Sequence, residues 1–540
     1  MTTPEFDILI VGSGPAGVSA AFPLVKSGMK VLMVDGGQRA KLDAPLLPYL
    51  ENRRLSTDQW KWMLGGDNHA LKFSGAVSPK LRTPTHAHVF SGFEHANKIL
   101  SSEFIALGSL AAGGLSNAWG CGVAKLSAED LTEFPFPPSV IEPSFAAVST
   151  RMGISGATDD DLKEYYGLDN WADRPIELDT LQGAMLRKYQ RHRLAIHHLG
   201  IRLGRSRVAA LSKNRVNTDP LTQGPDRLAC NLSGNCLWGC YRKSLYSALY
   251  DLDALKSFPN FTYRGGLIVD QFLNNENYLS VFVRPAASNS ESFQTLTTKK
   301  LVLAAGTLAT TRLAMQALKI QKSISMLSCP TAAFMLWRPT SFGRAHQDAF
   351  GLGQLSYTVT LQDETRLFGS LFSTTGIPTS EFARFMPLNK PTGLTILSAL
   401  LSSAMVGNLF LPGKFGVAQL KLNSDNSLGV SGSYASGVPE LMKQAKTKLA
   451  SAFRKLGAVI IPKSFTLGQP GGDIHYSSSL PMRHNPTLGE THPSGELYGI
   501  PNVFVVDGAS LSSLSEKSHT LTIMANADRI GRGIVSSAEG

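Results

Sequence analysis

The pattern of apolar and polar positions near the start of the chain predicts a strand, a glycine turn, a helix and a second strand. The run "FDILIV" at 6–11 is apolar, "GSGPAG" follows it, "VSAAFPLVKSG" has helical spacing, and "KVLMVDGG" at 30–37 is the second apolar run. Short apolar runs that alternate with helices are typical of parallel sheets. The pattern therefore indicates an α/β fold with a doubly wound, Rossmann-like domain.

Two later stretches also resemble the end of a parallel strand. They are "KLVLAAGTLATTRLAMQAL" at 300–318 and "NVFVVDGASL" at 502–511, hundreds of residues beyond the first strand. One sheet must then be assembled from discontinuous segments, with insertions between them. We assign 1–45, 95–135, 215–330 and 466–540 to this cofactor-binding domain.

The insertions at 46–94, 136–214 and 331–465 are assigned to an α+β substrate-binding domain. Within the last of them, "GLGQLSYTVTLQ" at 351–362 alternates like a strand, and "FGVAQLKLNSDNSLGVSG" at 415–432 predicts a hairpin. Both indicate an antiparallel sheet. The apolar run "GLTILSALLSSAMVGNLFLP" at 393–412 contains Ser, Thr, Asn and Gly, so we interpret it as a buried helix or a lid rather than a membrane span.

Composition narrows the function classes. Of 540 residues, 43% are hydrophobic and 17% charged, as in folded proteins, and the net charge is +11. The positive charge favours an anionic substrate or membrane surface. The chain has no dense basic run interleaved with aromatic residues, so little beyond the net charge indicates nucleic-acid binding. Five cysteines and the acidic start "MTTPEFDILIVG" lead us to expect a cytoplasmic protein, with peripheral membrane contact as the alternative.

The glycine turn carries the spacing of a dinucleotide-binding loop. Gly12, Gly14 and Gly17 fit G-x-G-x-x-G, in which the first permits a tight turn, the second admits a pyrophosphate and the third lets helix pack on strand. Asp35 ends the next strand, where a carboxylate accepts hydrogen bonds from ribose hydroxyls. The cofactor contacts expected here are Gly12, Gly14, Pro15, Ala16, Gly17, Asp35 and Gly36.

Six stretches together resemble the glucose-methanol-choline (GMC) oxidoreductase family. They are "VGSGPAG", "GSLAAGGLSNAWGCG" at 108–122, "LVLAAGTLATTRL", "HYSSSLPM", "GIPNVFVVDGASL" and "SHTLTIMANADRIG". The resemblance implies FAD as cofactor and a bacterial-type alcohol or sugar dehydrogenase or oxidase. It also implies further FAD contacts from Gly113, Gly114, Ser116, Asn117, Val269, Ala305, Gly306, Asp507, Gly508 and Thr520.

The same resemblance nominates the catalytic residues. In that family a histidine in an HxxGTxxM-like pattern is the principal base, and the pattern here is His475, Ser478, Ser479 and Met482, with serine replacing Gly and Thr. A second position, at the start of the final helix, corresponds to His519, or to Ser518 in an alternative alignment. An imidazole titrates near neutrality, so it can accept a hydroxyl proton while hydride leaves the same carbon for flavin N5.

Several alternatives stay open at this point. The substrate is a sugar, a polyol or another small alcohol, and the electron acceptor is oxygen or a carrier protein or quinone. Because hydroxynitrile lyases resemble the same family, a non-redox lyase that contains FAD is the alternative function. A binding or carrier role is a third.

A cysteine cluster raises a separate question. "CNLSGNCLWGC" places Cys230, Cys236 and Cys240 at Cx5Cx3C, a spacing similar to that of iron–sulfur-bearing sugar dehydrogenases of the family. Those segments continue with Pro, whereas Tyr241 follows here. We weigh an iron–sulfur cluster against three reduced or partly disulfide-bonded cysteines in a loop without metal, and favour the second.

Overall fold

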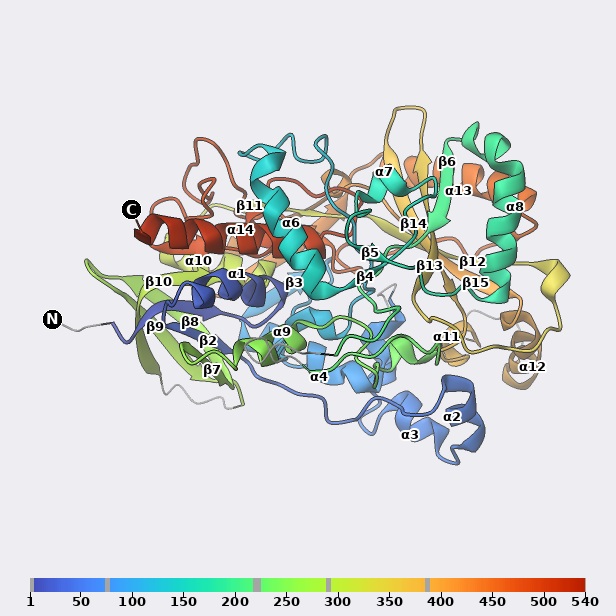
Figure 1. Ribbon diagram of the computed structural model, residues 1–540, viewed down its shortest axis with the longest axis horizontal. Helices are drawn as coiled ribbons and strands as arrows, with labels where there is room; N and C mark the ends of the chain where they lie inside the picture. The colour runs from blue at the N-terminus through green and yellow to red at the C-terminus, as the bar shows by residue number, and fades with distance from the viewer. Residues whose placement is uncertain (1–3, 73–77, 217–224, 288–292, 384–388, 540) are drawn as a thin grey trace.

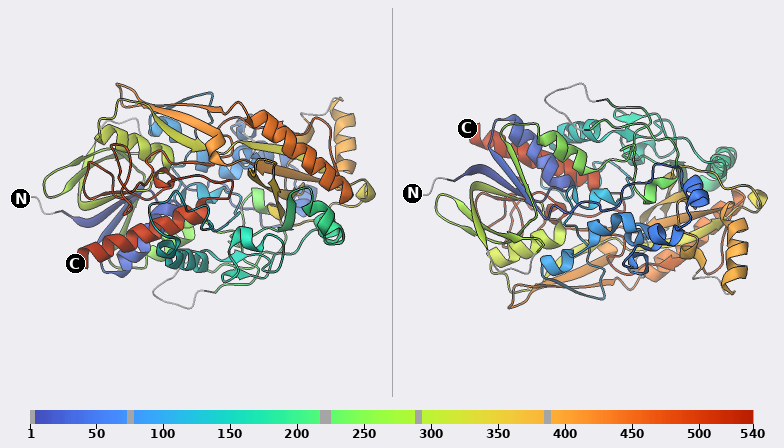
Figure 2. Two further views of the ribbon diagram at one scale, coloured as in Figure 1. Left: turned by 90° about the horizontal axis from the view of Figure 1, so that it is seen from above. Right: turned by 90° about the horizontal axis from the view of Figure 1, so that it is seen from below.

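The computed structural model describes residues 4–72, 78–216, 225–287, 293–383 and 389–539. Figure 1 shows an elongated molecule with the first parallel sheet and both termini at one end and a large antiparallel sheet at the other. The two views in Figure 2 show the same separation along the long axis.

The first sheet is the doubly wound one that the sequence predicts. Its order is β7-β2-β1-β10-β9-β8, with β21 also paired to β10, and β7, β2, β1, β10 and β21 run parallel. The strands are β1 (Phe6–Val11), β2 (Val31–Asp35), β7 (Phe261–Gly265), β8 (Leu267–Asn274), β9 (Leu279–Pro285), β10 (Gln294–Leu303) and β21 (Val503–Val505). The prediction of one sheet built from discontinuous segments is confirmed, because β1 and β21 both pair with β10.

Helices cover both faces of this sheet because the paired parts of its central strands carry apolar side chains on both sides. Ile8 and Ile10 pack toward α1 (Pro15–Lys26), α9 (Ala248–Leu255) and α14 (Thr520–Glu539). Leu9 and Val11 pack on the other side, where α10 (Thr307–Ala317) lies. Successive side chains of a strand point to opposite faces, so an uninterrupted apolar strand needs both layers.

The second sheet is antiparallel throughout. Its order is β18-β12-β15-β14-β13-β6, with β19 also paired to β12. Helices α8 (Thr180–His197) and α13 (Val438–Lys455) bury their apolar faces against it. The strands are β6 (Ile201–Arg205), β12 (Thr331–Trp337), β13 (Gly353–Thr360), β14 (Arg366–Ser373), β15 (Ala404–Phe410), β18 (Val459–Ile460) and β19 (Thr466–Leu467).

A third sheet joins segments that we had assigned to different domains. Its order is β20-β11-β16-β17-β3, made of β3 (Ile99–Ser102), β11 (Ile324–Ser328), β16 (Gly416–Leu422), β17 (Leu428–Tyr434) and β20 (Tyr476–Ser477). The predicted hairpin is β16 and β17, but it does not share a sheet with β13. The domain limits inferred from the sequence stay a prediction.

Shorter elements complete the described chain. A two-stranded pair, β4 (Ile154–Ser155) and β5 (Ala172–Asp173), lies near α6 (Pro138–Met152). The remaining helices are α2 (Tyr49–Leu55), α3 (Gln59–Leu64), α4 (Ala87–Phe90), α5 (Phe93–Ala96), α7 (Lys163–Tyr166), α11 (Ser380–Ala383) and α12 (Lys390–Leu401).

The apolar run at 393–412 is not one helix, which corrects our interpretation. Its first half lies in α12, and its second half is strand β15 at the centre of the antiparallel sheet. Leu397 and Leu401 are buried, while Leu394 and Ile396 are exposed. Within the described residues, no helix has both the length and the apolar character needed to cross a membrane.

Candidate active site at a dinucleotide cradle

The glycine turn between β1 and α1 has the shape that a dinucleotide needs. A Cβ on Gly12 would lie 2.3 Å from the carbonyl oxygen of Ala304, and one on Gly17 would lie 1.9 Å from the carbonyl oxygen of Gly12. By contrast, the nearest protein atom to a Cβ on Gly14 is 3.9 Å away. The outer glycines thus allow close packing, and the middle one leaves space for a ligand at the N-terminus of α1, whose cap has no side-chain hydrogen bond.

The acidic residue at the end of β2 is held in place by the protein. Asp35 accepts hydrogen bonds from the hydroxyl of Ser13, from the Tyr263 hydroxyl at 2.6 Å and from the Gly37 amide at 2.9 Å. Burial raises the pKa of Asp35, while these hydrogen bonds lower it. Asp35 lines the cavity beside Gly36, and its contact with a ribose stays a prediction.

The loop at 113–117 is shaped by its own side chains. The hydroxyl of Ser116 donates to the Gly113 carbonyl at 2.6 Å and accepts from the Ala248 amide at 2.8 Å. The Asn117 amide donates to the carbonyl of Gly114 at 2.9 Å. Gly114 lines the cavity, whereas Gly113, Ser116, Asn117 and Gly17 are not among its lining residues. In the structure these four shape the loop and the helix packing around the cavity.

The carboxyl ends of β10 and β21 supply the opposite part of the cradle. Asp507 accepts hydrogen bonds from the Gly306 amide at 2.9 Å and from the Thr310 hydroxyl, so it joins the β21 end to the start of α10. Burial raises the pKa of Asp507 to about 6. The other predicted residues that line the same cavity are Pro15, Ala16, Val269, Ala305, Gly508 and Thr520.

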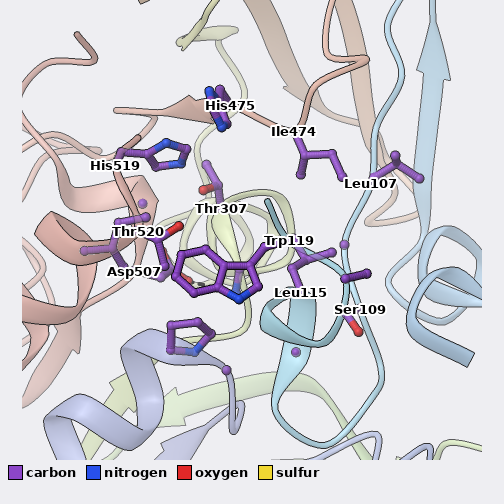
Figure 3. Close-up of a pocket in the computed structure, with 18 of the residues that line it drawn as sticks. Leu107, Ser109, Leu115, Trp119, Thr307, Ile474, His475, Asp507, His519 and Thr520 are labelled. Carbon is purple, nitrogen blue, oxygen red and sulfur yellow. Dashed lines mark hydrogen bonds between the residues drawn. The ribbon is translucent and has the colours of Figure 1, made fainter. Parts of the chain in front are cut away.

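Both candidate histidines lie on this cavity, which has a volume of about 340 Å³. The rings of His475 and His519 meet edge to face with their centroids 4.9 Å apart, and Figure 3 shows them together above Trp119. His475 also stacks on Phe410 of β15, at 4.9 Å. The fold thus brings residues from the last seventy positions of the chain to the same cavity as Gly12.

The cavity environment keeps both imidazoles neutral at physiological pH. Burial lowers the pKa of His475 to about 3, with a smaller contribution from His519. Burial lowers the pKa of His519 to about 4. A neutral imidazole can accept a proton, which is the state that a general base requires.

The N-terminus of α14 lies at the same cavity. The Ile523 amide donates to the His519 carbonyl at 2.9 Å, so His519 is at the N-terminal end of the helix. The alternative residue, Ser518, also lines the cavity, and a Cβ on Gly122 would lie 3.0 Å from its hydroxyl oxygen. The helix N-terminus brings a partial positive charge to this side of the cavity.

Ser478 and Ser479, which replace Gly and Thr in the histidine pattern, hydrogen-bond to other hydroxyl groups of the protein. The hydroxyl of Ser479 is 2.6 Å from that of Thr311, and the Ser478 hydroxyl is 3.0 Å from that of Ser477. Neither serine lines the cavity. The backbone of this segment hydrogen-bonds to residues 508–510, which fixes His475 relative to the end of β21.

The cysteine cluster gives the iron–sulfur alternative no support. Within the described residues, no group of three or more His, Cys, Asp or Glu side chains is arranged to hold a metal ion. Cys230, Cys236 and Cys240 are free thiols. Burial raises the pKa of Cys230 to about 11 and that of Cys236 well above its usual value, so these two thiols stay protonated.

Sequence reasoning missed several residues on the cavity. Lys80 is buried there and donates to the carbonyl of Trp119. Phe410 and Asp473 also line the cavity. Asp473 stands two positions before His475 in the chain, which is the one signal that could have identified it; Lys80 and Phe410 carry no motif.

Comparisons with known proteins bear on the fold. Residues 6–92 match the family described as pyridine nucleotide-disulphide oxidoreductase, and no curated protein matches the chain. Among solved structures, the fold is similar to that of pyridoxine 4-oxidase from Mesorbium loti. The TM-score is 0.58 at 12% identity, over 98% of this chain and 99% of that one.

Two further structures give the same result. An FAD-dependent oxidoreductase from Chaetomium thermophilum matches with a TM-score of 0.58 at 12% identity, over 99% of this chain and 100% of that one. Formate oxidase from Aspergillus oryzae, from a structure on FAD modification, matches with a TM-score of 0.60 at 12% identity, over the full length of both chains. The chain shares the fold of FAD-dependent oxidoreductases. The predicted fold class is confirmed, and FAD as cofactor is supported.

Proposed function

We propose that the protein is an FAD-dependent oxidoreductase that oxidises a CH–OH group of a sugar, polyol or other small alcohol, with His475 as the base. One observation carries the proposal: two neutral imidazoles and a dinucleotide cradle share one cavity. A base is needed beside a redox cofactor when a hydroxyl proton and a hydride leave the same CH–OH group.

The chain's own residues fit FAD at both ends of the cradle. Gly12, Gly14 and the start of α1 suit the pyrophosphate, and Asp35 suits the adenosine ribose. Asp507 lies farther along the cavity, toward His519, and Gly508 lines the same cavity. Bound FAD supplies a hydride acceptor at flavin N5.

His475 and His519 would have different roles in the reaction. His475 takes the hydroxyl proton, and His519 or Ser518 hydrogen-bonds the substrate oxygen so that the reacting carbon stays oriented. The positive end of α14 stabilises negative charge that develops on this side of the cavity.

The substrate side of the cavity is formed by the antiparallel sheet. Phe368, Phe372 and Phe410 give it apolar walls, while Ser356, Ser370 and Asn408 give it hydrogen-bonding groups. Such a mixture suits a small organic alcohol with further polar groups, and it supports neither a nucleic-acid nor a protein substrate.

The test is anaerobic reduction of the cofactor by a panel of alcohols and sugars, followed by bleaching of the oxidised flavin band. We expect His475→Ala to slow reduction by about 10²- to 10⁴-fold with FAD content unchanged. His484 lies nine residues farther on and is exposed, so His484→Ala is the matched control and should reduce at the wild-type rate.

Two outcomes would contradict the proposal. A cofactor that stays oxidised with every alcohol, while the protein cleaves a hydroxynitrile, would favour the non-redox lyase. Equal rates in His475→Ala and His484→Ala would remove His475 from the chemistry. Reoxidation of the reduced protein by oxygen, compared with a quinone, separates an oxidase from a dehydrogenase.

A further inference from the structure

A buried carboxyl group lies beside the proposed base. Oδ2 of Asp473 is 3.6 Å from Nδ1 of His475, and Oδ1 accepts a hydrogen bond from the His475 backbone amide at 3.4 Å. Both Oδ2 and Nδ1 are closed off from solvent, and neither has a hydrogen-bond partner among the described residues. The two unpartnered atoms lie just beyond hydrogen-bonding distance of each other, so a small side-chain rotation would let them share one proton.

The backbone between the two side chains is strained. Ile474 has φ of +65°, in the left-handed region that β-branched residues rarely adopt because of the clash at Cβ. Such conformations persist only where the surrounding structure imposes them, and they cluster at functional sites. The strained residue is therefore the one that separates Asp473 from His475.

The orientation of the imidazole follows from its exposure. The side chain of His475 is 23% exposed and that of Asp473 is 6% exposed. Because Nδ1 has no accessible surface, the exposed part of the ring lies at the cavity, between Phe410 and His519. Nε2 is then the nitrogen left for the substrate.

We propose that Asp473 is a positioning residue whose carboxylate accepts the Nδ1–H of His475, which leaves the Nε2 lone pair free to take the hydroxyl proton. When that proton arrives, the carboxylate stabilises the resulting imidazolium. No other bond changes on the protein: one proton moves from the substrate oxygen to Nε2, and the Nδ1 proton stays in place. This inference rests on the proposed function of His475.

A dependence on pH follows from the surroundings of the pair. Burial raises the pKa of Asp473 to about 8. Below that pH the protonated carboxyl donates to Nδ1, the ring proton moves to Nε2, and His475 cannot act as a base. Reduction of the cofactor should therefore become faster as the pH rises through the titration of Asp473.

Other titratable groups face the pair. His519 titrates at about 4, while burial raises the pKa values of Cys329, Tyr434 and Tyr476. Glu516 acts electrostatically on Cys329, and burial raises its pKa to about 7. Because Glu516 titrates in the same window without touching His475, Glu516→Gln is the matched control.

The first experiment compares Asp473→Asn with Asp473→Glu and Glu516→Gln, all loaded with FAD. An amide at 473 donates to Nδ1 and fixes the unproductive tautomer, so we expect Asp473→Asn to lower the limiting reduction rate by about 10²- to 10⁴-fold and to abolish its pH dependence. Asp473→Glu keeps a carboxylate and should recover part of the rate. Glu516→Gln should keep the wild-type profile.

The second experiment needs no activity. Nitrogen-15 NMR of histidine-labelled protein, with His475→Gln to assign the signal, reports which ring nitrogen carries the proton. We expect Nδ1–H in the wild type above the titration of Asp473 and Nε2–H in Asp473→Asn at every pH. An Nε2–H tautomer in the wild type throughout the pH range would overturn the inference even if neither Asp473 variant folds.

The two proposals fail in different ways. If His475→Ala abolishes reduction while Asp473→Asn keeps the wild-type rate and pH profile, the role of Asp473 is wrong and the proposed function stands. If no alcohol reduces the cofactor but the NMR tautomer changes as expected, the proposed function is wrong and the proton arrangement stands.

Discussion

Lys517 forms a buried ion pair immediately before the cavity residues Ser518 and His519. Its ammonium is 2.7 Å from Asp130 Oδ2 and 3.2 Å from the carbonyl oxygen of Lys125. The Lys517 side chain is 1% exposed and that of Asp130 is 12% exposed. Lys517→Met removes the cation, keeps most of the volume and leaves a carboxylate with little access to water.

The size of the effect follows from what remains around that carboxylate. Removal of one partner of a buried pair costs about 3–5 kcal/mol. Here the amide and hydroxyl of Ser127 still donate to Asp130 Oδ2, each at 2.8 Å. We therefore expect the lower end, about 3 kcal/mol of unfolding free energy.

Urea unfolding followed by tryptophan fluorescence, with FAD in excess, measures this loss. The matched control is Lys61→Met, because Lys61 and Asp58 are also 2.7 Å apart but are 60% and 55% exposed. The exposed pair should contribute about 0–1 kcal/mol. Asp130→Asn combined with Lys517→Met should recover much of the loss, since no unpaired charge remains.

The ion pair also predicts the direction of the pH effect. Burial would raise the pKa of Asp130, but Lys517 and Ser127 bring it below its usual 3.8. A lowered folded pKa gives stability that is present above about pH 4 and is lost as the pH falls further. Equal losses in Lys517→Met and Lys61→Met at neutral pH would refute this reasoning.

Two other predictions concern the cradle and the second histidine. Gly17→Ala places a Cβ 1.9 Å from the Gly12 carbonyl oxygen, so we expect loss of bound FAD, measured as the flavin-to-protein absorbance ratio. Gly437→Ala, with no atom within 4 Å of the added Cβ, is the control, and a full FAD content in both variants would contradict the steric argument. Because the pKa of His519 is about 4 in the fold and about 6.5 when unfolded, the unfolded chain binds more protons between these values. Stability should therefore fall as the pH falls from 6.5 to 4, and His519→Gln should flatten that slope in urea titrations at each pH.

The parallel sheet and its glycine turn could be predicted because their requirements are local. A Cβ on Gly17 would meet the carbonyl oxygen of Gly12 in the same turn, and the apolar runs at 6–11 and 30–35 need helices on both faces. The run at 393–412 misled us, since apolar residues alone do not separate a buried helix from a helix followed by a central strand. The split became visible only once β12 and β14 paired with β15.

His475 could be nominated from a short pattern, but the partners that make it a base could not. Phe410 comes from the antiparallel sheet and His519 from the start of α14. Asp473 is buried near Cys329, which follows β11, and near Tyr434 at the end of β17. Steric clashes between residues that are close in sequence can be predicted from the amino-acid sequence itself. Desolvation and contact through space depend on segments hundreds of residues apart, and these act on a side chain only after the sheets have assembled around it.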